Sequence, residues 1–139
     1  MYDARSAYVA TAVETAAPAR VITLLFDRLL LDVDRAATAL AAADAPGATG
    51  HLQHAQDIVA ELMSSLDEHA WDGGPGLMSL YGYLFSTLVE AGVHADAEKV
   101  AECRSIVAPL AEAWHGAAAS LTQTAPAPAP AASGLLGVG

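Results

Sequence analysis

The 139-residue sequence has few basic residues, few aromatic residues and a single cysteine. Its six Lys and Arg residues are outnumbered by 16 Asp and Glu residues, which gives a formal net charge of −10. Because no basic patch can form to neutralise phosphates, we expect neither nucleic-acid binding nor docking on an anionic membrane surface. Cys103 has no partner for an intramolecular disulfide, which fits a reducing compartment, and we therefore expect a cytoplasmic protein.

Long hydrophobic runs are also missing, although 54 % of the residues are hydrophobic. The longest apolar run near the start is interrupted at Asp27, far short of the roughly 20 residues that a bilayer span needs. The N-terminus carries charged residues and no apolar segment of the kind found in a signal peptide. Strand-forming residues are sparse and never alternate over a useful length. The sequence therefore predicts an all-α fold without membrane insertion.

Apolar residues recur at alternating steps of three and four, which places them in one stripe along an α-helix. Two of these stripes face each other across Gly73-Gly74-Pro75, a sequence typical of a helical hairpin. Four such helices joined by short loops predict an antiparallel four-helix bundle. The expected helices run from 18 to about 43, from 49–52 to about 70, from 75 to 92, and from 97 to 121.

The helix ends follow from residues with restricted conformations. Pro18 suits the first turn of the first helix, and Gly92 suits the position just after the third. Asp96 is a natural N-cap for the fourth helix. Pro109 lies inside that helix, where it removes one hydrogen bond and is expected to kink the axis.

The two ends of the chain are expected to lie outside the bundle domain, which spans 18–121. Residues 1–17 carry only a weak apolar stripe and predict a short N-terminal arm. Residues 122–139 are rich in Ala and Pro, which predicts a disordered tail. The tail ends in apolar residues that are either a short docking peptide or a frayed terminus: Leu135, Leu136 and Val138.

Residues that could carry chemistry do not form a complete site. Glu112 and His115 match one half of a di-metal motif that needs two such pairs. His51 and His54 have the spacing of metal ligands but no further ligands, and we interpret them as surface histidines. Cys103 falls on the apolar stripe of the fourth helix. We expect no catalytic site, cofactor or metal; a metalloenzyme, the alternative, would contain stoichiometric iron or manganese.

Several large apolar side chains lie beside the predicted stripes rather than within them. One interpretation is a wide buried stripe, which soluble helices often have. The other is a groove that accepts an amphipathic helix from another protein. The residues concerned are Val21, Leu24, Leu31, Ile58, Met63, Tyr83 and Phe85.

An ordered series of short motifs resembles the flagellar secretion chaperone FliS family over residues 1 to about 118. The series is Ala7-Tyr8, Leu24-Leu25-Phe26-Asp27, Ala55-Gln56-Asp57-Ile58-Val59, Leu66-Asp67, Gly73-Gly74, Leu80-Tyr81, Ala91, Asp96-Ala97 and Ala113-Trp114. The resemblance implies a helical-bundle export chaperone in the cytoplasm. Such proteins bind the C-terminal region of flagellin, prevent its premature polymerisation and help deliver it to the flagellar type III export gate.

The resemblance also implies a role for the N-terminal arm. The family's arm, including a tyrosine that matches Tyr8, is held to cover part of the binding surface and to influence handover at the gate. The alternative for Tyr8 is an aromatic side chain that only anchors the arm. Together with the apolar residues above, Tyr8 completes the set expected to bind partners. The alternative is a structural bundle that self-associates through the same apolar faces, for example as a homodimer in the absence of a client.

Overall fold

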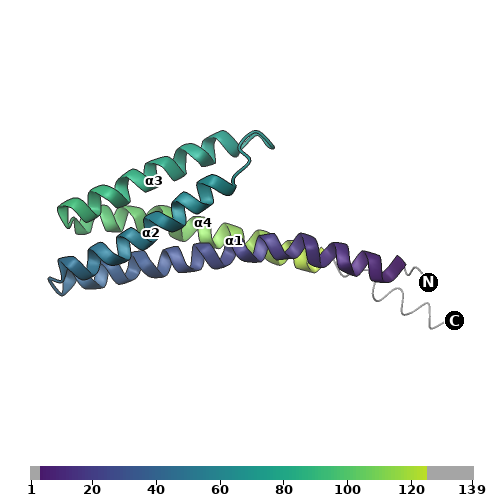
Figure 1. Cartoon of the computed structure of the whole chain (residues 1–139), viewed down its shortest axis with the longest axis horizontal. Coiled ribbons are helices and arrows are strands. Elements are labelled where there is room, and N and C mark those ends of the chain that lie inside the picture. Colours follow the sequence, from purple (N-terminus) through teal and green to yellow (C-terminus); the bar gives the residue numbers. More distant parts are fainter. Residues whose placement is uncertain (1–3, 125–139) are drawn as a thin grey trace. The chain divides into compact units, whose positions relative to one another are not determined.

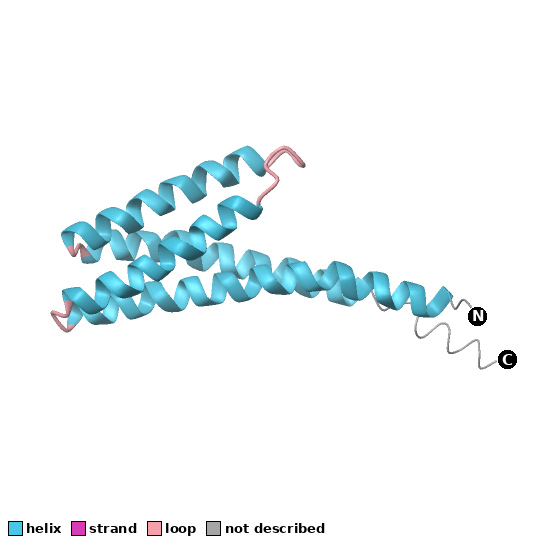
Figure 2. Ribbon diagram, viewed as in Figure 1, coloured by secondary structure: helices cyan, strands magenta, loops and turns pink. Residues whose placement is uncertain are grey.

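The described part of the chain consists of four helices and the loops between them. The computed structural model describes the backbone of residues 4–124 and the side chains of residues 18–121. The helices are α1 (Ala4–Ala41), α2 (Ala45–Ser65), α3 (Gly74–His94) and α4 (Ala97–Thr124), and residues 4–124 contain no strand (Figures 1 and 2). The predicted all-α four-helix bundle is therefore confirmed. No helix among the described residues is both long and apolar enough to cross a membrane.

The chain divides into two compact units, Leu24–Ala111 and a second one made of Met1–Thr23 with Glu112–Gly139. The unit Leu24–Ala111 contains α2, α3 and the adjoining parts of α1 and α4. Within it, α2 and α3 pack side by side as an antiparallel hairpin (Figure 1). All four helices contribute to its core, so this unit contains the bundle that positions the candidate site.

The core of this unit is formed mainly by the predicted apolar stripes. The rings of Phe26 on α1 and Tyr81 on α3 lie with their centroids 6.4 Å apart in a tilted arrangement, which favours an aromatic pair. Burial of each large apolar side chain stabilises the fold by about 1.5–3 kcal/mol. The most deeply buried stripe residues are Phe26, Leu29, Val33, Leu52, Val59, Leu84, Leu88, Val100, Cys103 and Val107.

The expected start of the first helix at Pro18 is wrong, because α1 begins at Ala4 and continues through Pro18. Pro18 cannot donate the hydrogen bond that an internal helical residue makes. The preceding segment is rich in alanine, the residue with the highest helix propensity, and this local preference outweighs the cost of one missing bond. The backbone of the predicted arm is thus helical from Ala4 onward.

The turn between α1 and α2 starts α2 earlier than expected, at Ala45. The side chain of Asp44 accepts a hydrogen bond from the backbone N–H of Gly47 at 2.9 Å, which satisfies a free donor of the first turn. Ala43 adopts a left-handed φ of 61°, and the N–H of Asp44 reaches back to the carbonyl of Ala39 at 2.8 Å. Ala43 therefore occupies the left-handed position after the end of α1, which is usually taken by glycine.

α3 ends in the same way, but the residue that follows its end is not Gly92, which the sequence predicted for this position. Ala95, with φ 49°, is the left-handed residue, and the N–H of Asp96 bonds to the carbonyl of Ala91 at 3.0 Å. Gly92 lies inside the helix, where a Cβ atom would be 3.8 Å from Leu52 of α2. Asp96 caps α4 as predicted, since its side chain accepts from the N–H of Glu98 at 2.9 Å. Asp96 also accepts from the next N–H in the chain at 3.3 Å.

The remaining helix ends differ by a few residues from the expected ones. α2 ends at Ser65 rather than near Ala70, because a compact loop occupies the residues before Gly74. A Cβ atom on Gly74 would lie 2.0 Å from the carbonyl oxygen of Glu68, so only glycine fits this close approach of two backbone segments. α4 continues through Pro109 and ends at Thr124.

Candidate partner-binding surface

The outward side of α1 carries leucines that the monomer does not bury. Leu24 is 56 % exposed and Leu31 is 41 % exposed. Arg28 and Arg35 are also exposed, and the four residues follow one another at steps of four, three and four. On a helix with 3.6 residues per turn, this spacing places them in a single row, opposite the core stripe of Phe26, Leu29 and Val33. We call Leu24, Arg28, Leu31 and Arg35 the outer seam of α1.

Val21 continues the same row one turn earlier and is 55 % exposed. It belongs to the unit Met1–Thr23 with Glu112–Gly139 rather than to the bundle unit. Tyr8 lies in the helical backbone of α1, but its side chain is outside the described residues. The apolar residues of the C-terminal tail are outside them as well.

One arginine of the outer seam is held by a buried carboxylate. Asp32 is fully buried, and its Oδ1 accepts a hydrogen bond from Nε of Arg28 at 3.1 Å. Its other oxygen bonds to Nδ1 of His54 on α2. A buried carboxylate is stable only when such partners compensate its charge, and here two partners do so from two helices. The pair with His54 therefore links α1 directly to α2.

The expected surface residues of α2 are not all at the surface. Ile58 is 6 % exposed and belongs to the core, which corrects its place among the surplus apolar residues. It precedes Val59 in the chain, and the buried stripe of α2 is wide enough to include both. Met63 is half-buried.

The two candidates on α3 lie on different sides of that helix. Tyr83 is 52 % exposed, whereas Phe85 is half-buried. Two residues advance an α-helix by about 200°, so their side chains project in nearly opposite directions. The structure therefore does not join the predicted set into one surface. Only Leu24 and Leu31 share an exposed row within the bundle unit.

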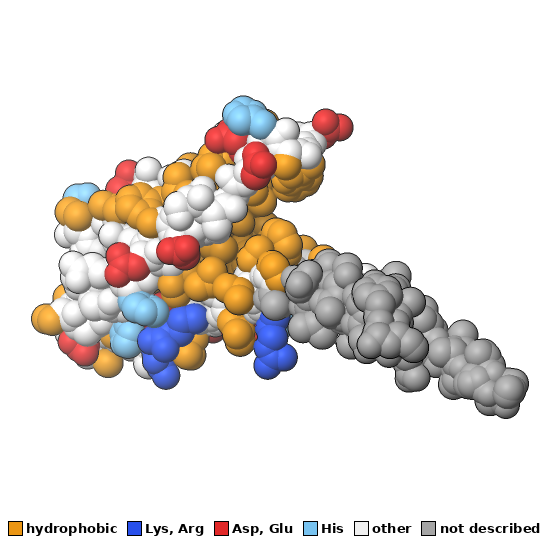
Figure 3. Space-filling model, turned by 45° about the vertical axis from the view of Figure 1, so that its right-hand side comes forward, with side chains coloured by type: hydrophobic (Ala, Val, Ile, Leu, Met, Phe, Trp, Pro, Cys, Tyr) orange, Lys and Arg blue, Asp and Glu red, His pale blue; other side chains and the backbone are white. Residues whose placement is uncertain are grey.

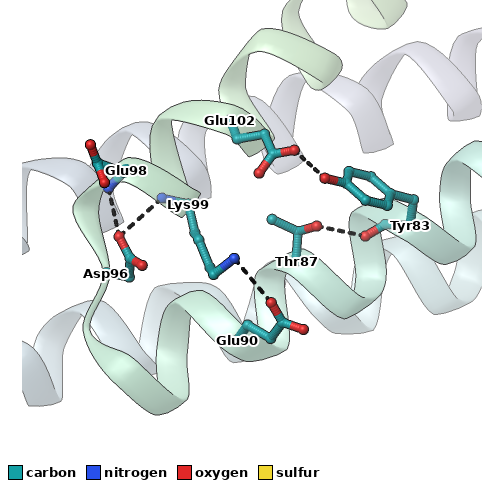
Figure 4. Close-up of polar contacts among 7 residues, drawn as sticks. All are labelled: Tyr83, Thr87, Glu90, Asp96, Glu98, Lys99 and Glu102. Carbon is teal, nitrogen blue, oxygen red and sulfur yellow. Dashed lines mark hydrogen bonds and ion pairs between the residues drawn. The ribbon is translucent and has the colours of Figure 1, made fainter.

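Tyr83 is part of a polar network between α3 and α4 (Figure 4). Its hydroxyl donates to Glu102 of α4, and Thr87 donates to the backbone carbonyl of Tyr83 at 2.8 Å. The hydrogen bond to Glu102, reinforced by the charge of that carboxylate, raises the pKa of Tyr83 above its ordinary value. Nearby, Lys99 forms an ion pair with Glu90 at 3.1 Å. These contacts hold α3 against α4 and leave the Tyr83 ring half exposed.

The residues considered for chemistry do not assemble a reactive centre. Among the described residues, no group of three or more His, Cys, Asp or Glu side chains could hold a metal ion. Cys103 is buried, and desolvation raises the pKa of its thiol to about 12. A thiol in this state is not a nucleophile near neutral pH. Its predicted place in the core of α4 is confirmed.

Two exposed apolar side chains and one buried acid were not anticipated. Trp71 lies in the loop between α2 and α3 and is half exposed, and Val93 is exposed near the end of α3. The position of Trp71 outside any helical stripe was an available signal. The signal for Asp32 was weaker: Arg28 and Asp32 are four residues apart, a spacing that brings two side chains together on a helix.

Basic and hydrophobic side chains lie next to each other on the molecular surface (Figure 3). Residues 36–98 contain no Lys or Arg but nine Asp and Glu residues: Asp44, Asp57, Glu61, Asp67, Glu68, Asp72, Glu90, Asp96 and Glu98. Most acidic residues of the bundle unit therefore lie on α2 and α3, in the loops beside these helices and at the start of α4. The outer seam of α1 is the place where two arginines and two exposed leucines alternate.

Comparison with known proteins extends over nearly the whole chain. A family model described as "Flagellar protein FliS" matches residues 1–121. The chain is 31 % identical over 108 residues to the flagellar secretion chaperone FliS of Escherichia coli, covering 76 % of this chain and 79 % of the relative. It is 31 % identical over 108 residues to the protein of the same name from Salmonella typhimurium, covering 76 % and 80 %. The corresponding protein of Bacillus subtilis is 28 % identical over 112 residues, covering 81 % and 84 %.

Proposed function

Because this chain belongs to the FliS family of flagellar secretion chaperones, we propose that it binds the C-terminal helical region of flagellin. The bound chaperone prevents premature polymerisation of the subunit. It then assists delivery to the flagellar type III export apparatus, where a component of the export gate is its second partner. In this role the chain acts in the cytoplasm as a binding protein rather than as an enzyme.

The observation that supports this proposal is the pair of exposed leucines on the outer seam of α1. Leu24 and Leu31 lie seven residues apart on one face, so an amphipathic helix laid along α1 would cover both. A client segment that is disordered when free pays an ordering cost on binding, which lowers affinity for a given contact area. Such a complex is specific and still releasable, as export requires.

Tyr8 has a separate place in the proposal. We assign it the handover role of the N-terminal arm, in which the arm covers part of the binding surface until the complex reaches the gate. A Tyr8→Ala variant would then retain flagellin binding and lose export of flagellin in cells. Unchanged export would remove Tyr8 from the proposal without affecting client binding.

The competing function is a structural bundle that self-associates through the same exposed leucines. Light scattering of the purified protein, with and without a peptide of the flagellin C-terminal region, distinguishes the two functions. The chaperone forms a one-to-one complex with the peptide, and any dimer present beforehand dissociates. A stable dimer that ignores the peptide would refute the chaperone proposal.

A further inference from the structure

The outer seam of α1 is not a uniform apolar row. Along it, Leu24, Arg28, Leu31 and Arg35 alternate a leucine with an arginine. Seven residues separate the two leucines and seven separate the two arginines, which is about 10 Å along the axis in each case. A partner helix that follows this row meets an apolar contact and a positive charge in turn, every half heptad.

The two arginines differ in how much of their hydrogen-bonding capacity the protein uses. Arg28 donates through Nε to Asp32, and its side chain is still about half exposed. Arg35 is exposed and makes no ion pair with a described residue. A guanidinium carries five N–H donors, so both arginines retain donors that can bind a carboxylate of a partner.

We infer that the outer seam binds a helix in which apolar and acidic side chains alternate at steps of three and four, with the acidic ones paired to Arg28 and Arg35. The inference rests on the proposed function, because it specifies which part of the flagellin C-terminal region lies on α1. The leucine contacts supply apolar burial, and the arginine contacts fix the register, as polar positions do in coiled coils.

Charge complementarity favours this occupant over the other candidates. A basic helix would bring its cations against Arg28 and Arg35. A second copy of this chain, paired through the same seam, would place arginine opposite arginine or opposite leucine, and neither arrangement supplies an acid within the seam. An acidic helix is also repelled by residues 36–98, which have nine acids and no Lys or Arg. α2 and α3 carry no Lys or Arg, whereas α1 carries Arg28 and Arg35 as well as the acids Asp27 and Asp34 beside them, so an acidic helix finds its cationic partners on α1.

Two variants of equal net charge test the inference. Arg35→Gln removes one positive charge from the outer seam. Gln53→Glu adds one negative charge on the exposed side of α2, where Gln53 lies in the segment without Lys or Arg. Both changes leave the chain one unit more negative. We expect Arg35→Gln to weaken binding of the flagellin C-terminal peptide about 3- to 10-fold, as the loss of a partly exposed interfacial ion pair does, and Gln53→Glu to leave it unchanged.

A charge exchange identifies the acidic partner. Acidic residues of the peptide are replaced by Lys one at a time, and each peptide is titrated against the wild type and Arg35→Glu. One substituted peptide should bind the wild type weakly and recover on Arg35→Glu, and the affinity of the native pair should decrease as salt is raised.

The outcomes separate the inference from the function on which it rests. If the wild type does not bind the peptide, the proposed function fails and the inference fails with it. If the wild type binds but Arg35→Gln matches Gln53→Glu and no charge exchange restores binding, the inference alone is wrong. A peptide-independent dimer that Leu31→Asp abolishes would assign the seam to a second copy of the chain and would also overturn the inference.

Discussion

Replacing Leu24 by Asp distinguishes the outer seam from the core on the same helix. Leu24 is 56 % exposed, whereas Leu29, little more than one turn further along, is fully buried. Complete burial of a leucine side chain contributes about 1.5–3 kcal/mol. The fraction of Leu24 that the monomer leaves exposed can therefore contribute about 0.8–1.7 kcal/mol when a partner covers it.

The Leu24→Asp substitution removes that contribution and places an unpaired carboxylate in the contact. Burying a charge without a partner adds a further penalty, so we expect the dissociation constant for the flagellin C-terminal peptide to rise at least about 100-fold. The free energy of unfolding should decrease by only about 1 kcal/mol, from lost packing of the half-buried side chain and the lower helix propensity of Asp.

Leu29→Asp is the matched control, since it makes the same chemical change at a buried position. It should cost more than about 4 kcal/mol of stability, because it buries an unpaired charge in the core. Calorimetric titration measures binding, and urea unfolding followed by circular dichroism measures stability. If Leu24→Asp destabilises the protein as much as Leu29→Asp, or binds the peptide with unchanged affinity, then Leu24 is not part of a docking surface.

Further predictions concern three residues of the fold, Ala95, Asp32 and Cys103. Ala95→Gly should raise the free energy of unfolding by about 0.5–1 kcal/mol, because Ala95 has a left-handed φ of 49° that glycine adopts without strain. A lower free energy of unfolding, measured by urea denaturation, would contradict this. Asp32→Asn should cost about 1–3 kcal/mol, measured in the same way, because Arg28 and His54 both lose a carboxylate oxygen that they contact. The thiol of Cys103, with its pKa raised to about 12, should react with a thiol reagent at pH 8 only after unfolding. Because the unfolded thiol ionises first, the contribution of Cys103 to stability should decrease as the pH rises above about 9, and a Cys103→Val variant should lack this decrease.

Hydrophobic periodicity predicted the bundle correctly because large apolar side chains are rarely stable anywhere but in the core. Phe26, Leu84 and Val107 are buried where their stripes placed them. Helix ends were less predictable, because each depends on the sum of several small local conformational energies. The alanine-rich segment carried α1 through Pro18, and Ala95 rather than Gly92 took the left-handed position after α3.

The candidate surface was predictable only in part, because a pattern on one helix does not show which neighbours cover its flanks. Leu24 and Leu31 remain exposed, whereas Ile58 is covered although it had the same status in the sequence. Periodicity also could not show that Tyr83 is held by a carboxylate of α4, since that contact joins residues 19 positions apart. Tertiary packing decides these cases, and it is not encoded in local spacing.

The contact between Arg28 and Asp32 links the stability of the bundle to the chemistry of the outer seam. Arginine side chains lose considerable rotamer freedom when a partner immobilises them, which lowers affinity. In this fold the buried carboxylate of Asp32 already holds Nε of Arg28, so part of that entropy is lost during folding rather than during binding. Arg28 is therefore the pre-organised charge of the seam, and Arg35, without such a contact, is the adaptable one. Replacing Arg35 should consequently change binding without changing stability, whereas replacing Arg28 should change both.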